Sequence, residues 1–313
     1  MTGKPDLADV RARARGAFLG LAVGDALGAP VEFMLHHEIA ADYGVHQDMT
    51  GGGWLRLRPG AVTDDTEMSL WLGRAIVAGG GFDAGRAATH LAAWLRLGPV
   101  DVGHTVRRGL RRFVVEGTLS GPPSPGDAGN GAAMRMLPVA LATLADHRAL
   151  ARAAVEQARI THNHPLSDAA CVHVGELVQL ACLGLGMPRL RRASDALVRA
   201  HPPFAFSPYP GLSGGYVAET LATVLHFLYR SRGFEECLVA VVNRGGDADT
   251  TGAIAGAIAG AWHGPEAIPR RWLKALAPAL REELEWLAGR LVDLSPLARG
   301  EAPDLAAGEA AGP

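Results

Sequence analysis

Residues 243–262, NRGGDADTTGAIAGAIAGAW, decide the fold class of this 313-residue chain. A glycine pair permits a tight turn, and two aspartates and two threonines then open a run of Ala, Gly and Ile. Gly252, Gly256 and Gly260 recur every four residues, so they lie on one face of the predicted helix. A face without side chains lets a second helix approach closely. We therefore predict a tightly packed core helix with carboxylates at its N-terminal end.

Helical periodicity dominates the rest of the chain. One stripe recurs every four residues, as expected for a buried helical face: Val102, Val106, Leu110 and Val114. Another helix is expected to open at Phe82-Asp83 and to stop at Gly98. Residues 239–242 are the best strand candidate, but the Ala and Leu around them favour a helix. The sequence thus predicts an all-α fold of many compactly packed helices.

The domain organisation is expected to be simple. No low-complexity linker divides the chain before about Pro296, and no repeat with a period of about 20–50 residues is evident. We therefore expect a single domain over residues 1–297. Residues 298–313 are rich in Ala, Gly, Pro and Glu, which predicts a disordered tail.

The composition excludes several classes of protein. The net charge of −2 argues against nucleic-acid binding, which requires a strongly positive surface. The three cysteines, odd in number and without CxxC spacing, indicate reduced thiols. Residues 1–15 contain no apolar signal core, and the apolar run 253–262 is far shorter than the ~20 residues that span a bilayer. We expect a cytoplasmic protein that does not insert into a membrane.

Two acidic clusters carry the strongest chemical signal, Thr63-Asp64-Asp65 and Asp247-Ala248-Asp249-Thr250. Helix capping explains one acid in each but not two. If the clusters meet, each pair of like charges at ~4 Å costs about 4 kcal/mol at an effective dielectric of ~20. Two divalent cations would remove this repulsion, and oxygen ligands favour Mg²⁺ or Mn²⁺ over Zn²⁺. The alternative is that the clusters cap separate helices.

Other segments leave a structural and a functional alternative open. Residues 126–135 form a Gly-rich loop expected to run into a helix, which suits a phosphate group or is an ordinary turn. In the expected loop 24–33, Glu32 is either a general base or a surface acid. Asp101 is either the N-cap of the next helix or a catalytic acid. The two histidines of residues 161–165 contact a ligand or simply stabilise the loop.

Four arginines lie on one face of the helix expected after Asp101. They form either a solvated surface or a docking face for an acidic partner: Arg107, Arg108, Arg111 and Arg112.

Taken together and in this order, these segments resemble the ADP-ribosylglycohydrolase family. Five markers carry the resemblance: GDALG at 24–28 followed by Glu32, TDDT at 63–66, GxGxxMR at 129–135, TH at 161–162 and GGDxDT at 245–250. They fall within residues 16–264, which is most of the chain. Residues 126–135, 161–170 and 243–252 look closest to the subgroup that acts on the nitrogenase iron protein. His104 is one departure, since Asn is expected there in that subgroup.

The resemblance implies an all-α, single-domain fold with a dinuclear Mn²⁺ or Mg²⁺ site in a central cleft. It also implies removal of ADP-ribose from an arginine of a target protein. In the subgroup named above the target is the nitrogenase iron protein, which hydrolysis reactivates, and a PII-type signalling protein is a further partner.

The resemblance also assigns individual residues. Six match the metal ligands of the family: Thr63, Asp64, Asp65, Asp247, Asp249 and Thr250. Glu32 and Asp101 match acidic groups at the reacting ribose. The backbone of Gly129, Asn130, Gly131 and Ala132 matches a pyrophosphate-binding loop. His162 and Tyr216 match ligand contacts, with Tyr216 as a stacking face for adenine.

Two rival functions remain open at the level of sequence. One is hydrolysis of ADP-ribose from another acceptor, such as serine, a nucleobase or a small molecule. The other is a non-catalytic role, as an ADP-ribose binder or a crystallin-like protein. A crystallin-like relic should have lost metal ligands, whereas all six are present here.

Overall fold

The computed structural model describes residues 5–211, 213–301 and 304. In these residues there are fourteen α-helices and four short 3-10 helices, with isolated β-bridges but no strands, which confirms the all-α prediction. The α-helices are α1 Leu7–Gly28, α2 His36–Tyr43, α3 Asp64–Gly79, α4 Ala84–Arg96, α5 His104–Glu116, α6 Leu137–Ala142, α7 His147–Arg159, α8 Pro165–Cys182, α9 Met187–Ala200, α10 Val217–Leu228, α11 Phe234–Val242, α12 Ala248–His263, α13 Arg270–Ala275 and α14 Pro278–Asp293. The 3-10 helices are η1 Ala29–Val31, η2 Pro125–Asp127, η3 Pro202–Phe204 and η4 Pro265–Ala267.

The centre of the fold is the pair α1 and α12, which pack together more extensively than any other two described helices. Each glycine of α12 lies against a glycine of α1, in the order Gly260 on Gly16, Gly256 on Gly20 and Gly252 on Gly24. The two helices are therefore antiparallel and their backbones touch. A Cβ added at Gly20 would lie 2.2 Å from the carbonyl oxygen of Gly256, so no larger residue fits there.

The prediction of a tightly packed glycine face on α12 is thus confirmed. The prediction that residues 24–33 form a loop is wrong over its first part, because α1 continues to Gly28 and η1 follows. The glycines of this segment serve the close approach to α12 rather than a turn, so Gly24 is helical and buried.

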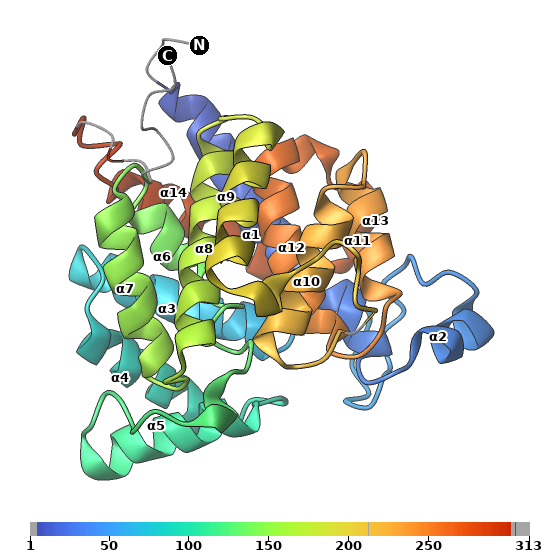
Figure 1. Ribbon diagram of the computed structural model, residues 1–313, viewed down its shortest axis with the longest axis horizontal. Coiled ribbons are helices and arrows are strands. Elements are labelled where there is room, and N and C mark those ends of the chain that lie inside the picture. The colour runs from blue at the N-terminus through green and yellow to red at the C-terminus, as the bar shows by residue number, and fades with distance from the viewer. Residues whose placement is uncertain (1–4, 212, 302–303, 305–313) are drawn as a thin grey trace.

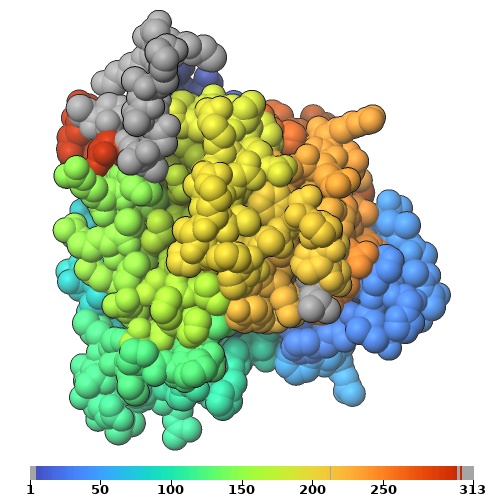
Figure 2. Space-filling model, viewed as in Figure 1, coloured from blue at the N-terminus to red at the C-terminus, as the bar shows by residue number. Residues whose placement is uncertain are grey.

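The other helices surround this pair. Helices α8, α10 and α11 pack on α12, α14 packs on α1, and α3 packs on α4, α6 and α14. Helix α2 and helix α5 stand apart at two corners of the molecule, in blue and in teal (Figure 1 and Figure 2). The bundle therefore has one deeply buried helical pair and two peripheral arms.

Most helix boundaries follow the sequence signals. Helix α4 begins directly after its N-cap Asp83, and residues 239–242 lie within α11. The predicted buried stripe is wrong at its end, since Val106 and Leu110 are buried but Val114 is 46% exposed. The cause is the position of α5, whose later turns extend past the body of the molecule (Figure 1).

The predicted tail, residues 298–313, falls mostly outside the described residues, and its disorder stays a prediction. Of its described part, Asp304 is held by two backbone hydrogen bonds. Its N–H donates to the carbonyl of Ala145 at 2.7 Å, and its carbonyl accepts from the N–H of His147 at 2.8 Å.

A substitution at the helical contact should separate crowding from helix propensity. Gly20→Ala places a methyl group against the backbone of α12 and should lower the free energy of unfolding by at least about 2 kcal/mol. Gly289→Ala is the matched control, because nothing lies within 4 Å of its added Cβ. It should raise the free energy of unfolding by about 0.5–1 kcal/mol. Denaturant unfolding monitored by circular dichroism measures both, and equal effects would refute the close contact.

Candidate functional site

The antiparallel contact brings the C-terminal end of α1 to the N-terminal end of α12. Gly28 lies against Ala248, where an added Cβ would be 2.2 Å from the carbonyl oxygen. Gly245 and Gly246 adopt φ values of 71° and 65°, a left-handed turn that other residues rarely adopt. Phe33 N–H then donates to the Gly246 carbonyl at 2.6 Å. These contacts set the segment after α1 beside the acids of the GGDADT motif.

Three carboxylates form the first group of the site. Glu32, Asp247 and Asp249 each offer an oxygen, and these oxygens lie within 4.8 Å of one another. Trp54 Nε1 donates to Glu32 Oε2 at 2.6 Å, and Asn130 Nδ2 donates to Asp247 Oδ2 at 2.9 Å. Glu32, which the sequence assigned to catalysis, therefore lies among residues that the sequence assigned to metal.

The TDDT segment forms the second group. Thr63 is the N-cap of α3, and Asp64 and Asp65 follow in its first turn. Thr250 Oγ1 donates to Asp65 Oδ2 at 3.2 Å, so the two acidic clusters meet. Asp65 Oδ1 is buried and has no hydrogen-bond partner. Such an orphaned oxygen is expected where a cation completes the site.

Asp25 is a central residue of this site that the sequence reasoning did not single out. It lies on α1, is fully buried and accepts hydrogen bonds from four donor groups. The donors are the N–H and the hydroxyl of both Thr63 and Thr66, at 2.5–3.1 Å. Asp25 thus fixes the start of α3 relative to α1. One feature of the sequence could have indicated this role. Asp25 lies in a segment with glycine at every fourth position, which predicts a buried helix.

Burial dominates the electrostatics of the site. It raises the pKa of Asp64, Asp65 and Asp249 well above the ordinary value, and neighbouring carboxylates raise it further. Burial also raises the pKa of Glu32 to about 8, although the bond from Trp54 acts in the opposite direction. The pKa of Asp25 is raised less, to about 6, because the hydrogen bonds from its four donors favour the charged form.

The donor set fits hard divalent cations. It consists of carboxylate oxygens and the hydroxyl oxygens of Thr63 and Thr250, with one buried carboxylate oxygen unpartnered. Oxygen ligands of this kind suit Mg²⁺ or Mn²⁺, whereas Zn²⁺ favours nitrogen and sulfur. Positive charge on a cation would also offset the repulsion that the raised pKa values report.

Asp101 lies at the edge of the same centre. Helix α5 begins at His104 with Gly103 as its N-cap, so the alternative that Asp101 caps this helix is wrong. Gly103 N–H donates to Asp64 Oδ2 at 3.4 Å, which ties the Asp101 segment to the TDDT acids. Burial, followed by the charge of Asp247, raises the pKa of Asp101. His104, the departure from the nitrogenase subgroup, is exposed.

The predicted pyrophosphate loop borders the acidic centre. Asn130 N–H donates to the Gly215 carbonyl at 3.1 Å, and Gly129 forms a β-bridge with Tyr216. Ala132 is fully buried behind Gly131. The helix that follows, α6, starts only at Leu137, after a series of turns, so the loop does not run directly into a helix as predicted.

His162 and Tyr216 occupy different environments. His162 is 2% exposed and packs against Gly129 and Gly131, so it supports the loop from behind. Its Nδ1 is 2.7 Å from Thr161 Oγ1, and burial lowers its pKa to about 3, which keeps the ring neutral. Tyr216 is 40% exposed at the N-cap of α10.

The arginines of α5 divide between two environments. Arg108 forms an ion pair with Asp127, and Arg112 donates to the carbonyl of Ile160 at 2.9 Å. These two hold α5 against the loops beside it. Arg107 and Arg111 are exposed.

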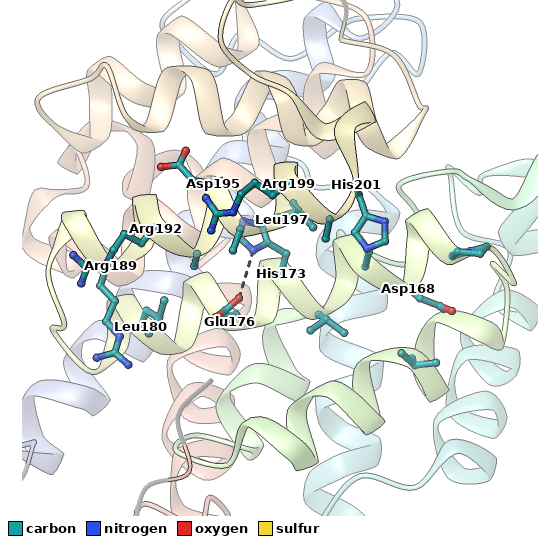
Figure 3. A pocket seen from close by; sticks show the side chains of 17 residues that line it. Asp168, His173, Glu176, Leu180, Arg189, Arg192, Asp195, Leu197, Arg199 and His201 are labelled. Carbon is teal, nitrogen blue, oxygen red and sulfur yellow. Dashed lines mark ion pairs between the residues drawn. The ribbon is translucent and has the colours of Figure 1, made fainter. Parts of the chain in front are cut away.

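A separate crevice of about 1050 Å³ lies between α8 and α9 (Figure 3). None of the acids of the candidate centre lines it. Its own acids are already paired: Asp168 with Arg159, Glu176 with His173, and Asp195 with Arg191. Volume alone does not identify an active site, and convergent buried carboxylates are the stronger indication. The acidic centre is therefore the candidate site.

Comparison with known proteins identifies the class. The family model for ADP-ribosylglycohydrolase matches residues 6–301. The chain therefore belongs to the ADP-ribosylglycohydrolase family, a family of enzymes. It is 53% identical over 297 residues to the ADP-ribosyl-[dinitrogen reductase] glycohydrolase of Rhodospirillum rubrum, with 95% of this chain and 100% of the relative covered.

Two further relatives agree with this class. The ADP-ribosylarginine hydrolase Tri1 of Pseudomonas putida (strain GB-1) is 32% identical over 299 residues, with 91% of this chain and 79% of the relative covered. A solved structure described as an ADP-ribosylglycohydrolase-related protein complex superposes with a TM-score of 0.81 at 37% identity, covering 92% of this chain and 99% of its own. Among the described residues, no helix combines the length and the apolar character needed to cross a membrane.

The raised pKa values predict how stabilisation by a cation depends on pH. A raised folded-state pKa stabilises the protein at low pH, and this contribution is lost as pH rises through that pKa. The pKa of Asp25 is raised from 3.8 to about 6, and that of Glu32 from 4.5 to about 8. The stabilisation from each group is therefore lost as the pH rises between its two values. The increase in melting temperature caused by Mn²⁺ should therefore grow between about pH 5 and about pH 8. Differential scanning fluorimetry with Mn²⁺ and with chelator measures it, and a constant increase would contradict the electrostatic account.

Proposed function

We propose that this chain is a hydrolase that removes ADP-ribose from an arginine of a target protein, and that the target is dinitrogenase reductase, the nitrogenase iron protein. Identity of 53% to a relative of that name, along its whole length, supports the target. A second relative named as an ADP-ribosylarginine hydrolase supports the acceptor. The single observation that carries the chemistry is the meeting of the two acidic clusters at Asp65 and Thr250.

The proposal includes two divalent cations, Mn²⁺ or Mg²⁺. Six residues would hold them: Thr63, Asp64, Asp65, Asp247, Asp249 and Thr250. When bound, the cations supply Lewis-acid polarisation at the ribose hydroxyls and at a water molecule. The four aspartates in turn offset the four positive charges of the two cations.

The side chains around the cations perform the rest of the chemistry. The bond between the ribose C1 and the guanidinium nitrogen breaks, and its electron pair stays on that nitrogen, which takes up a proton. Water adds at C1 and gives up a proton in turn. Asp101 or Glu32 transfers these protons, since burial raises the pKa of each above that of an ordinary carboxyl.

The remaining predicted contacts hold the rest of the substrate. The backbone N–H groups of residues 129–132 are assigned to the pyrophosphate, because successive N–H groups in a turn bind anions. Tyr216, which is partly exposed beside this loop, is assigned to the adenine ring. His162 acts through the loop that it supports.

The wider setting belongs to the same proposal. A single catalytic domain over residues 1–297 is supported by a family match to residues 6–301. A cytoplasmic location is supported by three free, buried cysteines, which are typical of a reducing compartment. A PII-type signalling partner is supported by the family resemblance alone. Hydrolysis from another acceptor and non-catalytic binding are the alternatives that the experiments below test.

Removal of the cations tests the proposed reaction. Chelation should abolish release of ADP-ribose from ADP-ribosylated dinitrogenase reductase, and Mn²⁺ should restore it, because the carboxylates alone repel one another. Release is followed by chromatography of free ADP-ribose. Full activity after metal removal verified by elemental analysis would overturn the metal assignment, and no release with Mn²⁺ present would overturn the substrate.

Asp101→Asn distinguishes chemistry from structure. Asp101 does not cap α5, so the variant should fold and bind ADP-ribose as the parent does. The amide cannot exchange the proton, and we expect turnover on ADP-ribosyl-arginine protein to fall by a factor of about 10²–10⁴. Steady-state kinetics and calorimetric titration with ADP-ribose measure the two properties. Turnover within a few fold of the parent would transfer the proton-transfer role to Glu32.

A further inference from the structure

An exposed aromatic pair stands directly outside the acidic centre. The side chains of Phe33 and Trp54 are 64% and 53% exposed, and their ring centroids are 5.5 Å apart at an interplanar angle of 46°. Phe33 follows Glu32 in the chain, and Trp54 donates its indole N–H to Glu32 Oε2 at 2.6 Å. Two large rings therefore lie in contact with solvent and with a residue of the reacting centre.

A short hairpin fixes the position of Trp54. Gly52 and Leu57 exchange backbone hydrogen bonds of 2.8 and 2.9 Å across it. Gly53 packs closely against the turn before Glu32. A Cβ added at Gly53 would lie 2.7 Å from the Ala29 carbonyl oxygen. The indole is thus anchored at its N–H edge and at its backbone, and its ring surface is left open.

Phe33 is held outward against a conformational cost. Its φ is +64°, a left-handed conformation that is rare for a bulky residue, and its N–H is tied to the Gly246 carbonyl. Strained backbone of this kind concentrates at functional sites. An exposed ring contributes little burial to the fold, so neither its position nor its strain is explained by stability.

We propose that Phe33 and Trp54 form the subsite that receives the guanidinium group of the substrate arginine. This inference rests on the proposed function, because it takes Glu32 to lie at the bond that breaks. The guanidinium, which leaves on the outer side of that bond, then contacts the aromatic pair. A guanidinium is a planar cation that stacks on aromatic faces, and the carboxylate of Glu32, which is not among the six residues that would hold the cations, attracts it.

The subsite accounts for selectivity towards arginine. A planar cation gains both stacking and electrostatic attraction between the rings and the carboxylates. A serine hydroxyl is small and neutral and gains neither. The inward-facing carboxylates serve the ribose, whereas the aromatic pair selects the acceptor attached to it.

Tryptophan fluorescence tests the subsite without any hydrolysis. The probe is argininamide, and its matched control is citrullinamide, which is planar but uncharged. Argininamide should change the emission of the parent protein loaded with Mn²⁺, and Trp54→Phe should remove this response. Trp286→Phe is the matched protein control, since Trp286 on α14 is also 53% exposed, and it should keep the response. A response retained in Trp54→Phe, or equal for citrullinamide, overturns the proposal.

Kinetics on ADP-ribosyl-arginine provide the second readout. Phe33→Asn removes one ring while Asn tolerates the left-handed backbone, and we expect KM to rise about tenfold with a smaller change in kcat. Trp54→Phe keeps an aromatic ring but loses the hydrogen bond to Glu32, so kcat should fall more than KM rises. An unchanged KM in Phe33→Asn overturns the subsite and leaves the proposed function intact. Failure of the parent to hydrolyse ADP-ribosyl-arginine overturns the proposed function, and the fluorescence titration then decides the subsite alone.

Discussion

The acidic centre depends on the backbone contact between α1 and α12. Facing glycines let the two helices touch, and their register sets which residues meet at the shared end. A slip of one glycine repeat would displace one helix by about 6 Å along the other. That shift exceeds the 4.8 Å within which the oxygens of Glu32, Asp247 and Asp249 lie. The contact thus determines the geometry of the site as well as the stability of the core.

This arrangement places destabilising groups at the end of the most extensively packed helical pair among the described residues. Buried carboxylates with raised pKa values repel one another, and few hydrogen bonds compensate them. Asp25 is the exception, since its four donors tie α3 to α1 and keep the ligand-bearing turn in place. The helical pair holds the acids close, Asp25 orients them, and a bound cation would supply the missing positive charge.

Local patterns in the sequence predicted local structure well. The glycine repeat of α12, the cap at Asp83 and the acidic motifs each depend on neighbouring residues, and the structure agrees with them. Features that depend on which helices pack together were missed. Gly24 was taken for a turn because its partner on α12 is distant in sequence, and the role of Asp25 appears only once α3 lies against α1. The exposure of Val114 likewise reflects where α5 ends relative to the body.

The pairing of the first helix with the twelfth also governs how the chain is made. Helix α1 leaves the ribosome before α12, and its glycine face has no partner until α12 emerges more than two hundred residues later. At about 5–20 residues per second, this delay is on the order of ten seconds or longer. Asp64 and Asp65 likewise precede Asp249 by more than 180 residues. The complete set of oxygen donors therefore exists only after α12 has been made.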